Sequence, residues 1–173
     1  RHLVGNEPVA VILADDLIKG SSTIKEMISN YSSGNMLAIM DVNNQDVSSY
    51  GIISPGKTLE NNMTEILGLI EKPSIEKAPS NMAVVGRYII EPSVFKELEK
   101  QNRGTSNEIQ LTDAIANRIG KSHCYGYKFT NDRFDCGSKL GFIQANIKLS
   151  IERDDLSEKL KSWLKDEFLN GDV

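Results

Sequence analysis

The feature that constrains the fold most is an apolar run that stops abruptly at two acids. The six residues from Val9 to Ala14 are all apolar, and Asp15 and Asp16 follow directly. A continuous apolar run of this length, rich in Val, is typical of a central strand covered on both faces. In open α/β sheets, ligands bind in the crevice beyond the carboxyl ends of the strands. The two acids therefore either cap a turn or hold something positively charged.

Strands and helices alternate along the rest of the chain. The pattern predicts strands at 35–42, 50–54, 64–73, 81–90 and 124–130, the last being the final strand, with a turn at Pro55 and Gly56. Helical spacing predicts helices within 21–34, 92–101 and 107–120, and two amphipathic tail helices marked by Ile143, Ile147 and Ile151 and by Leu156, Leu160, Trp163, Leu164 and Phe168. We expect Trp163 and Phe168 to make core or dimer contacts. Because strands alternate with helices early and become hairpin-like in the middle, we expect an α/β fold with a mixed sheet.

Composition excludes several classes of protein. A chain of 173 residues that is 39% apolar and 25% charged suits one globular domain. The net charge of −4 gives no reason to expect a nucleic-acid partner, and no apolar run approaches membrane-spanning length. Cys124 and Cys136 match no metal-ligand or redox spacing, which indicates free thiols in a reducing cytoplasm.

The chain reads as a piece of a longer protein. It starts without an initiator Met or a signal peptide, and the strand at Val9 to Ala14 follows almost at once. A central strand needs neighbours on both sides, so the chain looks like a piece of something longer. We therefore expect an N-terminal part to be missing.

Acidic and basic residues at strand ends are the first candidates for chemistry. A cation such as Mg²⁺ binds through one or two carboxylates plus phosphates and water, so Asp15 and one distant acid would suffice. Glu71 and Lys72 follow an apolar strand and would point to opposite faces if that strand stayed regular. If the backbone twists there, Glu71 can accept hydrogen bonds from hydroxyls while Lys72 reaches a phosphate. The alternative is a solvated charge pair.

Two glycines and one further acid are also candidate site residues. Gly51 and Gly86 lie inside predicted strands, where a glycine marks either a bulge or the close approach of a ligand to the backbone. Asp135 lies two residues before Gly137, just ahead of a predicted helix. It either caps that helix or points an acid into a cleft.

These segments together carry a family resemblance. The stretches PVAVILADDLI, YGII, LIEKP, APSNMAVVGRYII, EIQLTDAI and FDCGSKLGF occur in this order. Their order and spacing resemble those of bacterial UTP–glucose-1-phosphate uridylyltransferases, also called UDP-glucose pyrophosphorylases. The single motifs are weak, but the ordered set is specific and covers nearly the whole chain.

The resemblance implies a fold and a reaction. The fold would be a Rossmann-like sugar nucleotidyltransferase fold with a mixed central sheet, its sheet and site within 1–136 and C-terminal helices within 137–173. The reaction would convert UTP and glucose 1-phosphate to UDP-glucose and pyrophosphate with Mg²⁺, in a cytoplasmic homo-oligomer that uses the C-terminal helices as contacts.

The resemblance also implies roles for individual residues. Asp15 matches the metal-binding acid at the strand end, and Asp135 matches a second acid that faces the phosphates. Glu71 matches the acceptor of glucose hydroxyls. Lys72 matches the lysine that contacts the phosphoryl groups, so Lys72 and Asp15 would be catalytic.

Two further matches concern the sugar pocket. Gly51 matches a glycine whose backbone lies against the sugar, and Gly86 lies in a strand that lines the same pocket. The role of Asp16 is left open, because ILADD differs from versions of the motif with Pro before the first Asp.

One part of the family pattern is missing. The glycine-rich G-x-G-T-R loop that holds the base and triphosphate has no counterpart in this sequence. The segment alone is therefore expected to be inactive, and the uridine preference depends on the resemblance. A sister thymidylyl- or guanylyltransferase, or a non-catalytic module that binds UDP-sugars, is the alternative.

Overall fold

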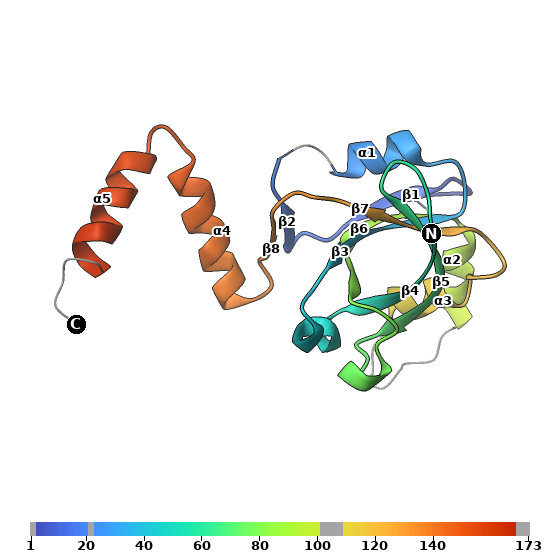
Figure 1. The fold of residues 1–173 in the computed structure, drawn as a ribbon. Coiled ribbons are helices and arrows are strands. Elements are labelled where there is room, and N and C mark those ends of the chain that lie inside the picture. The colour runs from blue at the N-terminus through green and yellow to red at the C-terminus, as the bar shows by residue number, and fades with distance from the viewer. Residues whose placement is uncertain (1–2, 21–22, 101–108, 169–173) are drawn as a thin grey trace. The chain divides into compact units, whose positions relative to one another are not determined.

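The fold is given by a computed structural model that describes residues 3–20, 23–100 and 109–168 (Figure 1). The chain divides into two compact units. The first comprises Arg1–Leu13 and Gly20–Asn131, and the second comprises Ala14–Lys19 and Asp132–Val173. Within the described ranges, no helix is long and apolar enough to span a bilayer.

The first unit is built on a six-stranded sheet in the order β1-β6-β3-β7-β5-β4. β3 and β7 are parallel, whereas the other neighbours are antiparallel, so the predicted mixed sheet is confirmed. An additional pairing of Ile52 with Ala83 joins β4 to β6. The strands are β1 (Val9–Ile12), β3 (Asn35–Asp41), β4 (Gly51–Thr58), β5 (Met63–Glu71), β6 (Met82–Ile90) and β7 (Cys124–Lys128).

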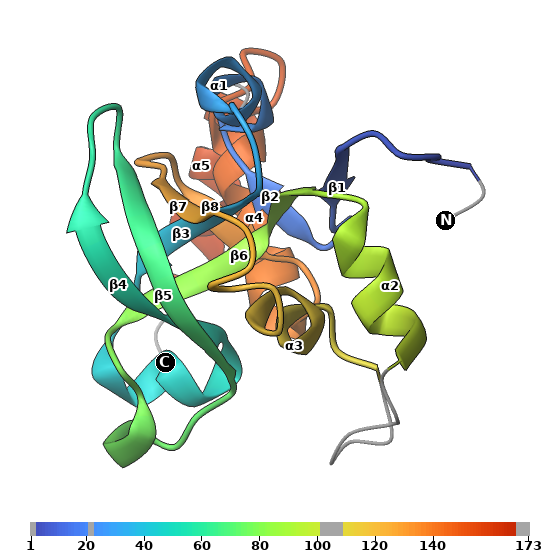
Figure 2. The same cartoon turned by 90° about the vertical axis from the view of Figure 1, so that its right-hand side faces the viewer.

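Three α-helices pack against this sheet, and α2 and α3 lie side by side (Figure 2). They are α1 (Thr23–Asn30), α2 (Ser93–Lys100) and α3 (Leu111–Ala116), with short 3₁₀ turns η1 (Asn44–Ser49) and η2 (Ile75–Lys77). α3 is shorter than the predicted helix, because its described part begins at Leu111 and gives way to turns after Ala116. The parts of the predicted helices at 21–22, 101 and 107–108 lie outside the described residues. The core combines β3, β4 and β6 with α2 and α3, including Leu37, Ile39, Ile53, Ile90, Val94 and Ile115.

β1 differs from the prediction of a buried central strand. Among the strands of the described residues it pairs with β6 alone, and its residues alternate between half-buried and exposed. Ile12 is 55% exposed. The apolar run reflects the strand propensity of these residues, but the prediction of burial on both faces is wrong for the described part of the chain.

The predicted turn at Pro55 and Gly56 is also wrong. β4 continues through both residues to Thr58, and its register with β5 shifts on either side of Pro55. A bulge tolerates proline because the missing N–H is not needed in the ladder. The hairpin turns instead at Asn61 and Asn62, whose φ angles of 56° and 59° suit the left-handed conformation that Asn adopts readily.

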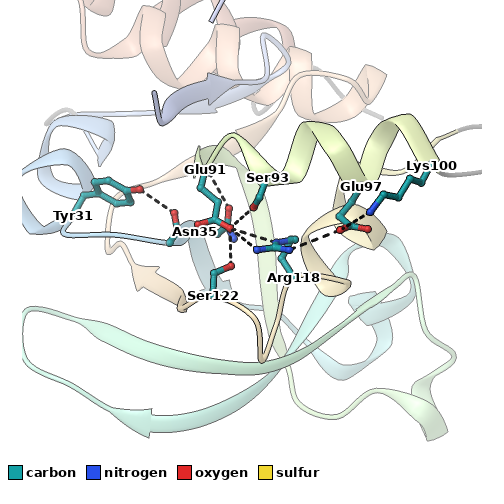
Figure 3. Close-up of polar contacts among 9 residues, drawn as sticks. Tyr31, Asn35, Glu91, Ser93, Glu97, Lys100, Arg118 and Ser122 are labelled. Carbon is teal, nitrogen blue, oxygen red and sulfur yellow. Dashed lines mark hydrogen bonds and ion pairs between the residues drawn. The ribbon is translucent and has the colours of Figure 1, made fainter. Parts of the chain in front are cut away.

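The half-buried side chain of Glu91 links segments of the first unit that lie far apart in the sequence (Figure 3). Glu91 Oε1 accepts hydrogen bonds from Ser93, from Ser122 at 2.7 Å and from Arg118 Nη2 at 3.3 Å. The Glu91 backbone N–H donates to Asn35 Oδ1 at 3.1 Å. Burial raises the pKa of Glu91, but the two serine hydroxyls and the Arg118 charge together hold it below its ordinary value.

The second unit contains a two-stranded antiparallel sheet and two helices. β2 (Asp16–Ile18) pairs with β8 (Arg133–Asp135), so β7 is not the last strand as predicted. The two tail helices are confirmed as α4 (Lys139–Ile151) and α5 (Ser157–Phe168). The predicted aromatic residues are not buried in a core: Trp163 is 53% and Phe168 61% exposed, and their rings contact each other edge to face.

Candidate active site

The end of β5 turns sharply between Glu71 and Lys72. Glu71 is the last residue of the strand and pairs with Gly51, the first residue of β4. Lys72 has a φ of 44°, and its N–H donates to the Tyr50 carbonyl at 3.0 Å. A non-glycine residue in this region is uncommon and costs on the order of 1 kcal/mol. The backbone twist that would let both side chains serve one site is therefore present.

The two side chains at this turn have different surroundings. Glu71 Oε2 accepts a hydrogen bond of 2.7 Å from the hydroxyl of Thr112, in the first turn of α3. Lys72 is exposed, and its ammonium makes no hydrogen bond or ion pair within the described ranges. The site thus offers a fixed carboxylate beside an available cation.

The predicted glycines lie at different places in the first unit. A Cβ on Gly51 would lie 3.1 Å from Glu71 Oε2 and 3.1 Å from the Thr112 methyl group, so Gly51 belongs to the same cluster. Gly86 is buried in β6, where its carbonyl accepts a hydrogen bond from the Leu13 N–H at 2.9 Å. The contacts of Gly86 therefore fix the end of β1, and its place in a sugar pocket stays a prediction.

The acids Asp15 and Asp135 converge within the second unit. Asp15 lies in the turn before β2, and Asp135 ends β8. A Cβ built on Gly137 would lie 2.9 Å from Asp15 Oδ2 and 3.1 Å from Asp135 Oδ1. The Cys136 N–H donates to the Asp15 carbonyl at 2.7 Å and holds the two segments together. The two carboxylates therefore face the same space above Gly137.

This pair fits a magnesium ion. No group of three or more His, Cys, Asp or Glu side chains suited to a metal occurs within residues 3–20, 23–100 and 109–168. Mg²⁺ is commonly held by one or two carboxylates together with water and substrate phosphates, so two acids are sufficient. Asp15 and Asp135 could hold the ion in this way.

Neighbouring residues settle two alternatives that the sequence left open. Asp16 is buried, pairs with the guanidinium of Arg133 and stands opposite Asp135 in the ladder. A buried carboxylate paired in this way has a structural role. The cap of α4 is Ser138, whose hydroxyl accepts from the Gly141 N–H at 3.0 Å. Asp135 is therefore not the helix cap; its Oδ1 accepts instead from the Gly137 N–H at 3.1 Å.

Two contributors to these clusters were not singled out from the sequence. Thr112 lies far from Glu71 in the chain, and a threonine within a helix carries no distinctive signal. Gly137 entered the sequence-based prediction only because it marks the position of Asp135, two residues before it. The spacing Asp135-Cys136-Gly137 is the one sequence signal that could have indicated a position where nearby carboxylates leave no room for a side chain.

Residues 1–151 match the nucleotidyl transferase family, and the chain belongs to that family. The predicted fold is therefore confirmed.

Individual relatives narrow the comparison. The chain is 37% identical to a UTP–glucose-1-phosphate uridylyltransferase of Staphylococcus epidermidis over 168 residues, which is 95% of this chain and 58% of the relative. It is similar to a UDP-glucose pyrophosphorylase crystallised with UDP-glucose, with a TM-score of 0.83, 42% identity and coverage of 88% and 59% of the two chains. It is also similar to a UTP-bound UGPase of Acinetobacter baumannii, with a TM-score of 0.82, 32% identity and coverage of 96% and 59%.

These relatives are longer than the chain. The chain spans 58% of the length of the curated relatives that it matches. The sequence resemblance to UDP-glucose pyrophosphorylases is confirmed over the shared part.

Proposed function

We propose that the complete product of this gene transfers the uridylyl group of UTP to glucose 1-phosphate, giving UDP-glucose and pyrophosphate. The observation that carries the proposal is the turn at Glu71 and Lys72, which sets a fixed carboxylate beside an exposed ammonium. The names of the similar proteins agree with this reaction.

The proposed reaction requires that the two substrates be positioned for attack, and it requires no general base. A phosphate oxygen of glucose 1-phosphate attacks the α-phosphorus of UTP in line, and pyrophosphate leaves. Because the attacking group is already an anion, no residue has to remove a proton from it. Lys72 stabilises the phosphoryl charge as a cation, and Glu71 accepts hydrogen bonds from the sugar hydroxyls. In this proposal the sugar lies against the backbone at Gly51, and the strand that contains Gly86 lines the same pocket.

Asp15 and Asp135 are proposed as the residues that hold the cation. A bound Mg²⁺ neutralises phosphate charge in such transfers. The convergence of Asp15 Oδ2 and Asp135 Oδ1 above Gly137 supports this assignment. In this proposal the sugar residues belong to the first unit and the metal residues to the second.

We also propose a homo-oligomer in the cytoplasm. The tail helices expose large apolar side chains, including Leu140 at 66% and Phe142 at 56%, and a second copy would cover them. The two free cysteines support a reducing compartment. Sedimentation of the complete gene product tests the oligomer, and a monomer at micromolar concentration contradicts it.

The function is tested by a nucleotide panel. The complete gene product is assayed for pyrophosphate release from UTP, dTTP, GTP and ATP with glucose 1-phosphate and Mg²⁺. We expect UTP to be preferred by at least about tenfold in kcat/KM. A preference for dTTP or GTP assigns a sister activity instead. Calorimetric binding of UDP-glucose without turnover of any nucleotide identifies a non-catalytic module.

A further inference from the structure

We propose that Thr112 is a positioning residue that sets the rotation of the Glu71 carboxylate and thereby the choice of sugar. The inference rests on the proposed role of Glu71 in holding glucose hydroxyls. It starts from three backbone segments that meet at one place: the beginning of β4, the end of β5 and the first turn of α3.

The contact itself is specific. Thr112 is only 8% exposed, and its hydroxyl donates to Glu71 Oε2 at 2.7 Å. The Thr112 methyl group lies 3.1 Å from the position that a Cβ on Gly51 would take, so it occupies the space beside that glycine. The hydroxyl is therefore directed at one carboxylate oxygen, and the methyl group packs beside Gly51.

The consequence concerns the other carboxylate oxygen. A terminal carboxylate rotates broadly about its last torsion unless something holds it. The bond from Thr112 occupies Oε2, whereas Glu71 Oε1 has no hydrogen-bond partner within the described part of the chain. Oε1 is thus the oxygen offered to a sugar hydroxyl, in a fixed direction. A fixed acceptor discriminates between epimers because a misplaced hydroxyl leaves it unpaired.

The experiment uses the complete gene product with matched substitutions. Thr112→Val keeps the shape and removes the hydroxyl, whereas Thr112→Ser keeps the hydroxyl. Thr64→Val is the control, because Thr64 is a buried threonine near the opposite end of β5. Steady-state kinetics are measured with glucose 1-phosphate, galactose 1-phosphate and UTP, and melting temperatures are measured alongside.

We expect Thr112→Val to raise KM for glucose 1-phosphate about tenfold and to narrow the preference for glucose over galactose, as loss of a bond to a charged group predicts. KM for UTP should stay within about twofold, and Thr112→Ser should remain within about threefold of the parent. Combining Thr112→Val with Glu71→Gln should add little to the loss caused by Glu71→Gln alone.

Three results overturn the inference, and they are distinguishable. If Glu71→Gln raises KM for glucose 1-phosphate but Thr112→Val matches the Thr64→Val control, Thr112 only packs and the proposed role of Glu71 stands. If Glu71→Gln leaves both KM and sugar preference unchanged, the role of Glu71 falls and the inference falls with it. If Thr112→Val lowers the melting temperature strongly, the Thr112→Ser variant decides: loss of sugar preference despite the retained hydroxyl contradicts the proposal.

Discussion

The carboxylates of Asp15 and Asp135 approach the same point above the Cα of Gly137, at 2.9 and 3.1 Å from where a side-chain carbon would stand. The two acids lie far apart in the chain, and their segments are joined through the Cys136–Asp15 backbone bond. Their convergence is the geometric basis for the proposed cation site, and it depends on the absence of a side chain at Gly137.

Gly137→Ala tests this dependence. The φ of Gly137 lies outside the left-handed region, so alanine fits the backbone, but its methyl group would displace both carboxylates. We expect the Mg²⁺ concentration for half-maximal activity to rise about tenfold, as for other residues that orient metal ligands. Because Gly137 is exposed, the melting temperature should hardly change. An unchanged Mg²⁺ requirement would show that the acids do not hold the ion there.

The positive φ of Lys72 predicts that a glycine at this position stabilises the fold relative to an alanine, although both substitutions lower activity. Glycine adopts a φ of 44° without the strain that a side chain causes. We therefore expect Lys72→Gly to unfold with a free energy about 1 kcal/mol higher than Lys72→Ala, while both variants lose turnover. Urea denaturation and kinetics of the two variants check this. Equal stabilities would mean that the backbone relaxes in the alanine variant.

Glu91 should make stability dependent on acid pH. Because its pKa is held below the ordinary value, its contribution is complete above about pH 4.5 and is lost as the pH falls through the folded-state pKa. We expect Glu91→Gln to cost on the order of 1 kcal/mol at pH 7 and less at pH 3.5. The free energy of unfolding is measured at both values, with Glu60→Gln, an exposed acid of the same unit, as the control. A cost that is independent of pH would contradict the charged network.

The two cysteines should differ in reactivity. Burial, with a smaller contribution from the Glu91 charge, raises the pKa of the Cys124 thiol to about 12. The unfolded thiol ionises near 8.5, so Cys124 stabilises the fold below that pH and loses this contribution as the pH rises towards 12. At pH 8, iodoacetamide should label Cys136 in the native protein and both cysteines in urea. Labelling of native Cys124 at the rate of Cys136, read by mass spectrometry, would contradict its burial.

The sequence allowed the mixed sheet and most strands to be predicted, because β3, β5, β6 and β7 are marked by apolar runs that bound them closely. β2 and β8 were missed because each has three residues and exists only through pairing with the other. The course of β4 through Pro55 depends on a bulge that no local pattern reveals. The helical spacing of apolar residues also could not indicate that Trp163 is exposed, since the exposure of a side chain depends on what its helix packs against.

The residues of the candidate site could be predicted where they mark a strand end, but not where they depend on tertiary contacts. Glu71 and Lys72 are recognisable as adjacent charges at a strand end, but their proposed use in one site depends on a backbone twist, which the structure shows as the φ of Lys72. Thr112 joins the cluster only through the packing of α3 on β5, a tertiary contact that sequence periodicity does not contain.

In the proposed enzyme, Glu71 binds the sugar, whereas Asp15 and Asp135 hold the cation. The most direct measurement is the rate of UDP-glucose formation by the complete gene product over a grid of glucose 1-phosphate and Mg²⁺ concentrations. It is made for Glu71→Gln, Asp15→Asn and Asp135→Asn, with Asp154→Asn, an exposed acid of the second unit, as the control.

We expect Glu71→Gln to raise KM for glucose 1-phosphate about tenfold at every Mg²⁺ concentration, because a neutral amide is the weaker acceptor. Asp15→Asn should lose about a hundredfold or more in turnover, equivalent to about 2.7 kcal/mol. Asp135→Asn should lose less and recover in part as Mg²⁺ is raised. An Asp135→Asn variant that melts much earlier but keeps the Mg²⁺ dependence of the parent would contradict the two-carboxylate cation site.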